Sequence, residues 1–226
     1  MRLLLISSSN VHGYGFLDHS EPEIRRILRG RTRVSFIPFA AHDHAAYTLA
    51  VHERLGRMGF EVVPVHDAAD IGSAEAIFTG GGNTFRLLRT LYERELLDAI
   101  RDRVELGTPY IGSSAGTNIA CPTIRTTNDM PIVETPAFAA LGLVPFQINP
   151  HYLDADPAST HQGETRETRI LEYLEENATP VVGLREGSML FVEDGTTTLL
   201  GTSNARIFRR GETPAEVLPG SVIALL

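Results

Sequence analysis

A strand-like run turns into a glycine-rich bend at Pro109-Tyr110-Ile111-Gly112-Ser113-Ser114-Ala115-Gly116. The bend has the pattern G-x-S-x-G, in which small neighbours allow a sharp strand-to-helix turn that exposes one hydroxyl group. The spacing of its glycines selects Ser114, rather than Ser113, as a candidate nucleophile. The same pattern also occurs in ordinary glycine- and serine-rich turns, so the rest of the chain has to support the assignment.

Apolar runs alternate with amphipathic segments from the N-terminus to Ile111. The runs are continuous rather than alternating, which is typical of parallel strands covered on both faces. We expect strands at 3–6, 34–38, 60–65, 74–79 and 109–111, and helices at 22–28, 47–58 and 84–106, the last broken near 93–95. This order predicts a doubly wound, mostly parallel α/β sheet with helices on both faces and ligand chemistry at the carboxyl ends of its strands.

The second half of the chain has a different character. Residues 121–136 lack a clear period and contain three prolines, which predicts a long loop. Loops of this length are uncommon in compact domains unless they have a function. An extended segment at 146–150 and a helix at 164–177 follow. From Val181 onward the pattern is β, with strands expected at 181–184, 189–192, 197–200 and 205–208. No linker or repeat interrupts the chain, so we expect a single domain over 1–226.

The composition limits the classes of function. The chain has 226 residues and a net charge of -8, which argues against a nucleic-acid surface. A single cysteine, Cys121, excludes an internal disulfide framework and suits a reducing compartment. No apolar run approaches the roughly 18 to 20 residues of a membrane span, and no signal peptide is evident. We therefore expect a cytoplasmic protein without a membrane partner.

A serine nucleophile requires a base, an acid that orients the base, and donors for an oxyanion. His151 is the best base among the eight histidines, because it follows an Asn-Pro turn at the end of an expected strand. Two carboxylates could orient it, Asp129 in the proline-rich loop and Glu186 after a later strand. The residues themselves leave this choice open.

A second glycine-rich turn at 80–82 follows an expected strand. It lacks the Lys-Ser/Thr of a phosphate-binding loop and the complete G-x-G-x-x-G spacing. It fits better as a second oxyanion element, whose backbone N–H faces the N–H of Ala115. His42-Asp43-His44 lacks a matching third ligand, so no metal site is expected.

Six stretches spread over most of the chain match the motifs of one family: 36–40, 80–85, 111–118, 120–132, 147–151 and 163–167. The run from 120 is the most specific of them. On these residues the chain resembles the peptidase E family of α-aspartyl dipeptidases, which has the class I glutamine-amidotransferase-like fold, itself flavodoxin-like. One departure is Ser113, where family members often carry a bulky aromatic residue, and this leaves the strictness of the specificity open.

The resemblance implies a role for each matching position. Ser114 would be the nucleophile and His151 the general base, with Gly82 and Ala115 forming the oxyanion hole. The orienting acid would be Asp129 or Glu186, and Asp129 is narrowly favoured because it lies in the most specific run.

The resemblance also implies that Arg166 binds the side-chain carboxylate of an N-terminal aspartate and that Asn83 contacts the substrate. Arg166 makes physical sense in this role, since a cation in the first turn of a helix opposes the helix dipole and gains no stability there. A guanidinium can pair with a carboxylate through two parallel hydrogen bonds. The alternative is a surface arginine paired with Glu167.

The resemblance, together with these residues, implies a serine dipeptidase that cleaves Asp-X dipeptides through an acyl-enzyme, as a monomer or homodimer, without metal or cofactor. One alternative is a cyanophycinase-type hydrolase of aspartyl-arginine material, which requires an open groove. Another is a non-catalytic amidotransferase-like binding domain, disfavoured because the serine, the histidine and both acids are present. A glutamine amidotransferase is disfavoured because its nucleophile would be a cysteine, and Cys121 lies well past the turn.

Overall fold

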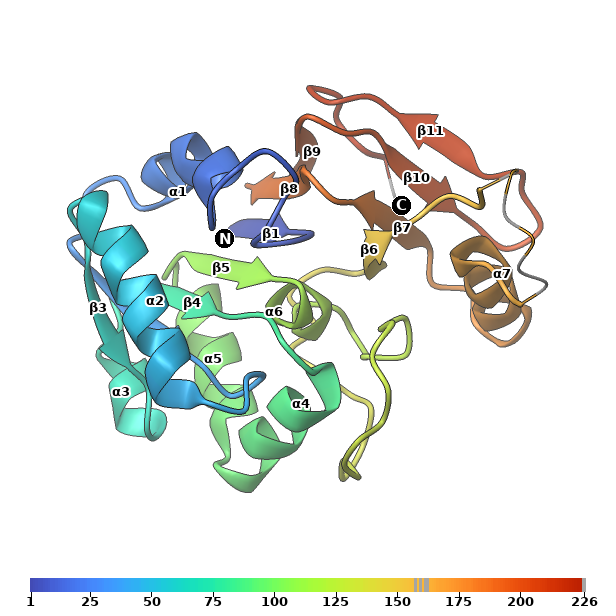
Figure 1. The fold of residues 1–226 in the computed structure, drawn as a ribbon. Helices are drawn as coiled ribbons and strands as arrows, with labels where there is room; N and C mark the ends of the chain where they lie inside the picture. The colour runs from blue at the N-terminus through green and yellow to red at the C-terminus, as the bar shows by residue number, and fades with distance from the viewer. Residues whose placement is uncertain (157, 159, 161–162, 225–226) are drawn as a thin grey trace.

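Two β-sheets with surrounding helices make up the computed structural model, which describes residues 1–156, 158, 160 and 163–224 (Figure 1). The first sheet has seven strands in the order β3-β2-β4-β5-β1-β8-β9. The first five of these are parallel, and β8 and β9 extend the sheet in antiparallel fashion from β1. The strands are β1 (Arg2–Ile6), β2 (Arg33–Ile37), β3 (Glu61–Pro64), β4 (Ile77–Thr79), β5 (Tyr110–Ser113), β8 (Ser188–Glu193) and β9 (Thr196–Gly201).

Helices cover both faces of the first sheet. Leu4 and Ile6 of β1 belong to a buried cluster with the apolar sides of two helices, α1 and α2. Leu3 and Leu5 belong to the cluster on the opposite face, with α3, α4 and α5. This confirms the predicted doubly wound α/β architecture. The helices are η1 (Asp18–Ser20), α1 (Glu21–Ile27), α2 (His44–Arg57), α3 (Ala68–Gly72), α4 (Thr84–Glu93), α5 (Leu96–Glu105), α6 (Ala115–Ile119) and α7 (Arg166–Glu176).

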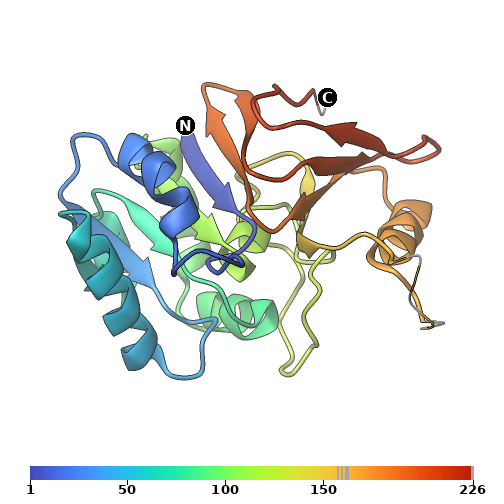
Figure 2. The same ribbon diagram turned by 45° about the horizontal axis from the view of Figure 1, so that its top comes forward.

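The second sheet has four strands in the order β11-β10-β7-β6, and Figure 2 shows it beside the β8–β9 end of the first sheet. β6 and β7 are parallel, and β10 is antiparallel to β7 and to β11. Val181 packs with α7 on one face, whereas Val182 and Leu184 join the large cluster that also contains β1 and β8. The strands are β6 (Gln147–Tyr152), β7 (Val181–Arg185), β10 (Ala205–Phe208) and β11 (Ala215–Val217).

The expected elements are present, with differences at short segments. The predicted break near 93–95 separates α4 from α5, and Glu95 has a left-handed φ of 54°. The β-rich C-terminal part is divided, because β8 and β9 complete the first sheet while β7 and β10 join β6. α3 and β11 were not predicted, since five and three residues are too few to establish a period.

The long loop is confirmed: between α6 and β6 the described residues form one isolated bridge, Thr123 to Ala139, and no helix or strand. None of the helices in the described part of the chain is long and apolar enough to cross a membrane. A single domain over 1–226 stays a prediction.

Candidate active site

Ser114 lies at the turn between β5 and α6, where its backbone has φ 53° and ψ −109°. This conformation is unfavourable for a residue with a Cβ and persists only where the surroundings impose it. The Ser114 N–H donates to Ile6 O at 3.0 Å. A Cβ on Gly112 would lie 2.5 Å from Gly116 O, and one on Gly116 would collide with Thr79 O. The two glycines of the motif are therefore required by the close approach of the backbone.

His151 lies in β6 and contacts the nucleophile across the two sheets. Its Nε2 is 2.8 Å from Ser114 Oγ, and its Nδ1 is 2.7 Å from Glu186 Oε1. The backbone of His151 has φ 54° at an irregularity in the pairing of β6 with β7. Three side chains thus form a continuous hydrogen-bonded series that can carry a proton from the serine to the imidazole while the carboxylate orients the ring.

Ser7, which follows β1, connects the first sheet to β6 and β7 of the second sheet. Its hydroxyl accepts the N–H of His151 at 2.9 Å and donates to Leu184 O at 2.7 Å. The Ser7 side chain is fully buried. Because His151 lies in β6 and Leu184 lies in β7, this one hydroxyl holds the backbone of both strands at the end of the parallel sheet.

Asp129 does not orient the histidine, and the narrow preference for it is wrong on geometry. Its Oδ2 accepts the N–H of Thr84 at 2.7 Å, at the start of α4. The first N–H groups of a helix have no partner within the helix, and the dipole favours a carboxylate there. Glu186 reaches His151 because the pairing of Tyr152 with Arg185 brings the two strand ends together. His151 and Glu186 are 35 residues apart, so no local sequence pattern reveals their contact.

Asn83 caps α4. Its side-chain oxygen accepts the N–H of Arg86 at 3.1 Å, and its amide donates to Met130 O at 2.9 Å. The structure therefore places Asn83 directly after the glycine-rich turn, bound to the same loop as Asp129. Its contact with substrate stays a prediction.

The two proposed oxyanion donors belong to different turns of the first sheet. Over the described residues, neither the Gly82 N–H nor the Ala115 N–H donates a hydrogen bond to another protein group. Gly82, Ser114 and His151 line one pocket of about 370 Å³. Gly82 lines this pocket and Ala115 directly follows Ser114, so N–H groups without a protein acceptor at these positions are available for a developing negative charge.

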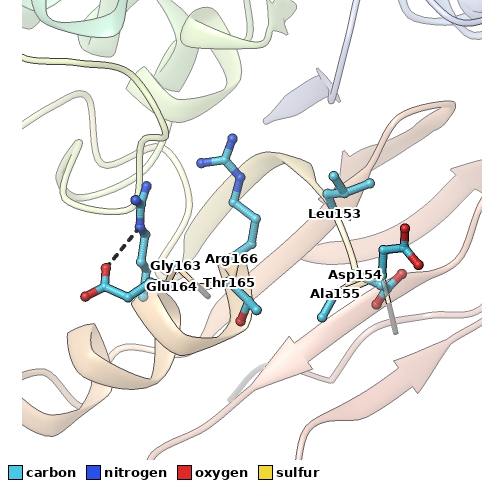
Figure 3. Close-up of a pocket in the computed structure, with 9 residues that line it drawn as sticks. Leu153, Asp154, Ala155, Gly163, Glu164, Thr165 and Arg166 are labelled. Carbon is cyan, nitrogen blue, oxygen red and sulfur yellow. Dashed lines mark ion pairs between the residues drawn. The ribbon is translucent and has the colours of Figure 1, made fainter. Parts of the chain in front are cut away.

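Arg166, the first residue of α7, lines a separate pocket of about 480 Å³ between that helix and the segment after β6 (Figure 3). That pocket shares no lining residue with the one that Ser114 lines. The neighbouring acids are engaged elsewhere, Glu164 with Arg169 at 3.4 Å and Glu167 with Arg206 at 3.1 Å. In the described part of the chain, the Arg166 guanidinium has no ion pair or hydrogen bond.

The electrostatic surroundings of Arg166 suit an anion. Burial lowers the pKa of its guanidinium, the positive charge of Arg169 lowers it further, and the negative charge of Asp129 opposes both. Such a half-buried cation gains most when a carboxylate enters its pocket. The pairing with Glu167 that was the alternative is not present, because Glu167 binds Arg206.

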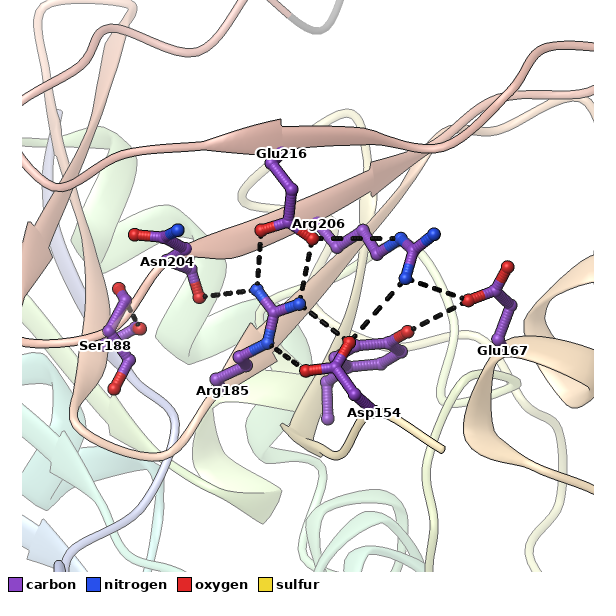
Figure 4. A network of polar contacts seen from close by, with 9 residues as sticks. Asp154, Glu167, Arg185, Ser188, Asn204, Arg206 and Glu216 are labelled. Atoms are coloured by element: carbon purple, nitrogen blue, oxygen red, sulfur yellow. Dashed lines mark hydrogen bonds and ion pairs between the residues drawn. The ribbon is translucent and has the colours of Figure 1, made fainter. Parts of the chain in front are cut away.

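Sequence reasoning missed Arg185, which immediately precedes Glu186. Figure 4 shows it between two carboxylates: its Nε and Nη2 bind Asp154 at 2.7 and 2.8 Å, and its Nη1 and Nη2 each bind Glu216 at 2.9 Å. These bonds raise the pKa of Arg185, and the guanidinium lowers the pKa of Asp154. Arg185 thereby ties the end of β7 to the segment after β6. Its partners are 31 residues away in either direction, so no local signal reveals them.

Other reactive side chains lie outside this site. Cys121 is buried, and burial raises the pKa of its thiol to about 12, so it stays protonated near neutral pH. Asp43 caps α2 by accepting the N–H of Ala46. Across the described residues, no group of three or more His, Cys, Asp or Glu side chains is arranged to hold a metal ion.

Known proteins are similar to this chain in sequence and in fold. The model of peptidase family S51 matches residues 3–200. A Streptomyces coelicolor protein named Peptidase E is 52% identical over all of this chain and 95% of its own length. A Drosophila melanogaster protein named "Probable alpha-aspartyl dipeptidase" is 47% identical over 96% of this chain and 93% of its own.

Two solved structures have the same fold at low identity. A crystal structure of a peptidase from an acI-B1 actinobacterium has a TM-score of 0.71 at 18% identity, covering 99% of this chain and 96% of that one. A second, from Listeria monocytogenes EGD-e, has a TM-score of 0.67 at 24% identity, covering 89% and 98%. With a family match over most of its length and relatives about half identical to it, the chain belongs to peptidase family S51.

Proposed function

We propose that this chain is a serine dipeptidase that hydrolyses dipeptides with N-terminal aspartate through an acyl-enzyme. The names of the relatives support this activity, since they are Peptidase E and alpha-aspartyl dipeptidase. The observation that carries it for this chain is the hydrogen-bonded series from Ser114 Oγ through His151 to Glu186. A strained turn that presents a serine to an oriented histidine is an arrangement for nucleophilic catalysis.

The reaction begins when Ser114 Oγ attacks the carbonyl carbon of the aspartyl residue while His151 Nε2 accepts the hydroxyl proton. The carbonyl oxygen becomes an oxyanion, and the N–H groups of Gly82 and Ala115 donate to it. His151 then gives the proton to the leaving amine, and the C–N bond breaks to form an ester on Ser114. Water attacks this ester with His151 as base, which releases aspartate and restores the serine. Glu186 accepts the Nδ1–H throughout and stabilises the imidazolium.

Specificity for aspartate is assigned to Arg166. Its guanidinium is unpaired among the described residues and sits beside the segment that follows His151, where a side-chain carboxylate of the substrate can pair with it. Asn83 stands next to the oxyanion donor Gly82, and its second amide hydrogen is available to the substrate. The partner is thus a small acidic peptide. We further propose that the protein is cytoplasmic and acts as a monomer or homodimer, since its single cysteine suits a reducing compartment.

Arg166→Met tests the specificity. Removing one partner of a desolvated charge pair costs about 2–5 kcal/mol, so kcat/KM for Asp-Leu should fall roughly 30- to 4,000-fold. Hydrolysis of Leu-Leu should change little, because that substrate has no carboxylate side chain. Arg169→Met is the matched control, since Arg169 lines the same pocket but is already paired with Glu164.

The outcome separates specificity from catalysis. Undiminished cleavage of Asp-Leu by Arg166→Met would remove Arg166 from the proposal, and a loss confined to Arg169→Met would transfer the role to that arginine. An Asp-initiated tripeptide should be a poor substrate of the wild type. Efficient cleavage of longer aspartyl polymers would instead favour the cyanophycinase-type reaction.

A further inference from the structure

The glycine-rich turn after β4 packs directly against the nucleophile. A Cβ on Gly81 would lie 3.1 Å from Ser114 Cβ, and one on Gly80 would lie 2.6 Å from the Tyr47 ring. A Cβ on Gly82, whose φ is 134°, would collide with Ala40 O. The turn therefore has no side chains that could hold it, and glycine backbone is intrinsically mobile. Hydrogen bonds must fix its orientation.

The backbone N–H groups of this turn are engaged except for one. Gly80 N–H donates to Ile37 O at 3.1 Å, and Asn83 N–H donates to Ala40 O at 2.9 Å. Gly81 N–H, in contrast, donates to a side chain, the hydroxyl of Tyr47, at 2.9 Å. Within the described residues this leaves the Gly82 N–H, the proposed oxyanion donor, as the group without a protein acceptor. The peptide that precedes this donor is held by a single phenol.

Tyr47 is suited to hold that peptide in place. It lies on α2, and its ring packs edge-on against Phe36 with centroids 5.2 Å apart. Burial raises the pKa of its hydroxyl, so the group stays neutral and can accept the N–H. The ring also lines the pocket that contains Ser114 and His151. The catalytic steps described above make no use of this hydroxyl.

A second hydroxyl in this pocket contacts the strand that carries the nucleophile. Ser9 lines the same pocket as Tyr47, and its Oγ is 2.6 Å from Ser113 Oγ. The Ser113 side chain is fully buried, directly before Ser114. The Ser9–Ser113 hydrogen bond thus lies directly beside the nucleophile turn.

We propose that Tyr47 is a positioning residue for the oxyanion hole: its hydroxyl holds the Gly80–Gly81 peptide so that the adjacent Gly82 N–H points at the oxyanion. The inference rests on the proposed serine-peptidase reaction. Without the hydroxyl, the Gly81 N–H loses its acceptor and the peptide can rotate about two glycine Cα atoms. The Gly82 donor is then misdirected when charge develops, whereas substrate in the ground state binds as before.

Tyr47→Phe removes this one oxygen and leaves the packed ring. Loss of an oxyanion donor costs about 100- to 1,000-fold in kcat, so we expect a misdirected donor to cost about 10- to 100-fold, with KM for Asp-Leu within about twofold of wild type. Tyr92→Phe is the matched control, because it also removes a tyrosine hydroxyl that binds backbone, at Ala139 O (3.0 Å), outside the pocket of Ser114. Its kcat should stay within about twofold of wild type.

A fluorophosphonate measures the same effect without any need for aspartate recognition. Ser114 Oγ attacks phosphorus, fluoride leaves, His151 takes the proton, and the phosphoryl oxygen accepts from the oxyanion donors. Intact-protein mass spectrometry gives the rate, which should fall in Tyr47→Phe by the same factor as kcat and stay unchanged in Tyr92→Phe. A wild type that reacts with the probe but does not cleave Asp-Leu would defeat the proposed substrate and leave this test intact.

Three results would overturn the positioning role. One is a Tyr47→Phe enzyme whose kcat and phosphonylation rate match wild type. Another is a raised KM at unchanged kcat, which would make Tyr47 a substrate-binding residue. The third is an equal loss in Tyr92→Phe, which would make the effect one of general stability.

Discussion

The two sheets contribute unlike halves to the candidate site. The first sheet provides Ser114, Gly82 and Ala115 through backbone geometry: a residue at φ 53°, glycines without room for a Cβ, and N–H groups without protein acceptors over the described residues. The second sheet provides His151 and Glu186 as side chains that are 37% and 54% exposed. The first half is held by its own backbone turns, with Ala115 buried, Ser114 partly buried and Gly82 exposed. The other is open to solvent and depends on its supports.

Ser7 and Arg185 hold the second half of the site in position. Even a charged pair on an exposed surface contributes only about 0–1 kcal/mol, so the exposed His151–Glu186 hydrogen bond cannot hold its own geometry. Ser7 binds the backbone of His151 and of Leu184, and Arg185 joins the ends of the two strands through Asp154. The exposed half is therefore precise because buried bonds to backbone and a bidentate arginine position it.

The largest expected effect comes from the first half. Ser114→Ala should reduce turnover of Asp-Leu by about a million-fold, because the nucleophile is lost while the turn keeps its backbone. The thermal unfolding midpoint should change little, since the hydroxyl is not a packing group. Measured kcat together with a thermal melt checks this. Substantial residual activity would mean that another nucleophile acts.

The next largest effect should come from the second half, when its acid Glu186 is replaced. In Glu186→Gln the amide can no longer stabilise the imidazolium, and we expect kcat to fall roughly 1,000- to 10,000-fold, as for the orienting acid of serine proteases. Asp129→Asn is the matched control: it should keep kcat within about tenfold and cost about 1 kcal/mol in the free energy of unfolding, because Asp129 accepts an N–H of α4.

Comparing the two variants by kcat and by urea denaturation decides between them. The opposite ranking would return the orienting role to Asp129. Comparable drops in both would show that Asp129 also serves the site, for example by binding the free amine of the substrate.

The smallest effect should come from the neighbour of the nucleophile. Ser113→Ala removes the hydrogen bond to Ser9 but leaves Ser114 in place, so kcat should stay within about tenfold of wild type. The buried Ser9 hydroxyl loses a partner, which should cost about 1–3 kcal/mol in unfolding free energy. Equal losses in Ser113→Ala and Ser114→Ala would mean that the wrong serine was selected.

The sequence by itself predicted what depends on neighbouring residues. Continuous apolar runs indicated parallel strands, and G-x-S-x-G placed Ser114 at a strained turn because only glycines tolerate the approach of Gly112 to Gly116 O. The break between α4 and α5 was also predicted locally. The residues also singled out His151 as the base, and the resemblance to a family added Arg166, without showing the contacts of either.

Which acid meets the histidine depends on how the strands pair, and no local sequence pattern contains that information. Asp129 and Glu186 each have the right chemistry, but the start of α4 takes the first, and the parallel pairing of β6 with β7 brings the second to His151 Nδ1. The same is true of Arg185 and Tyr47, whose partners lie about thirty residues away. Local propensity acts over a few residues, whereas these contacts exist only once two sheets have packed together.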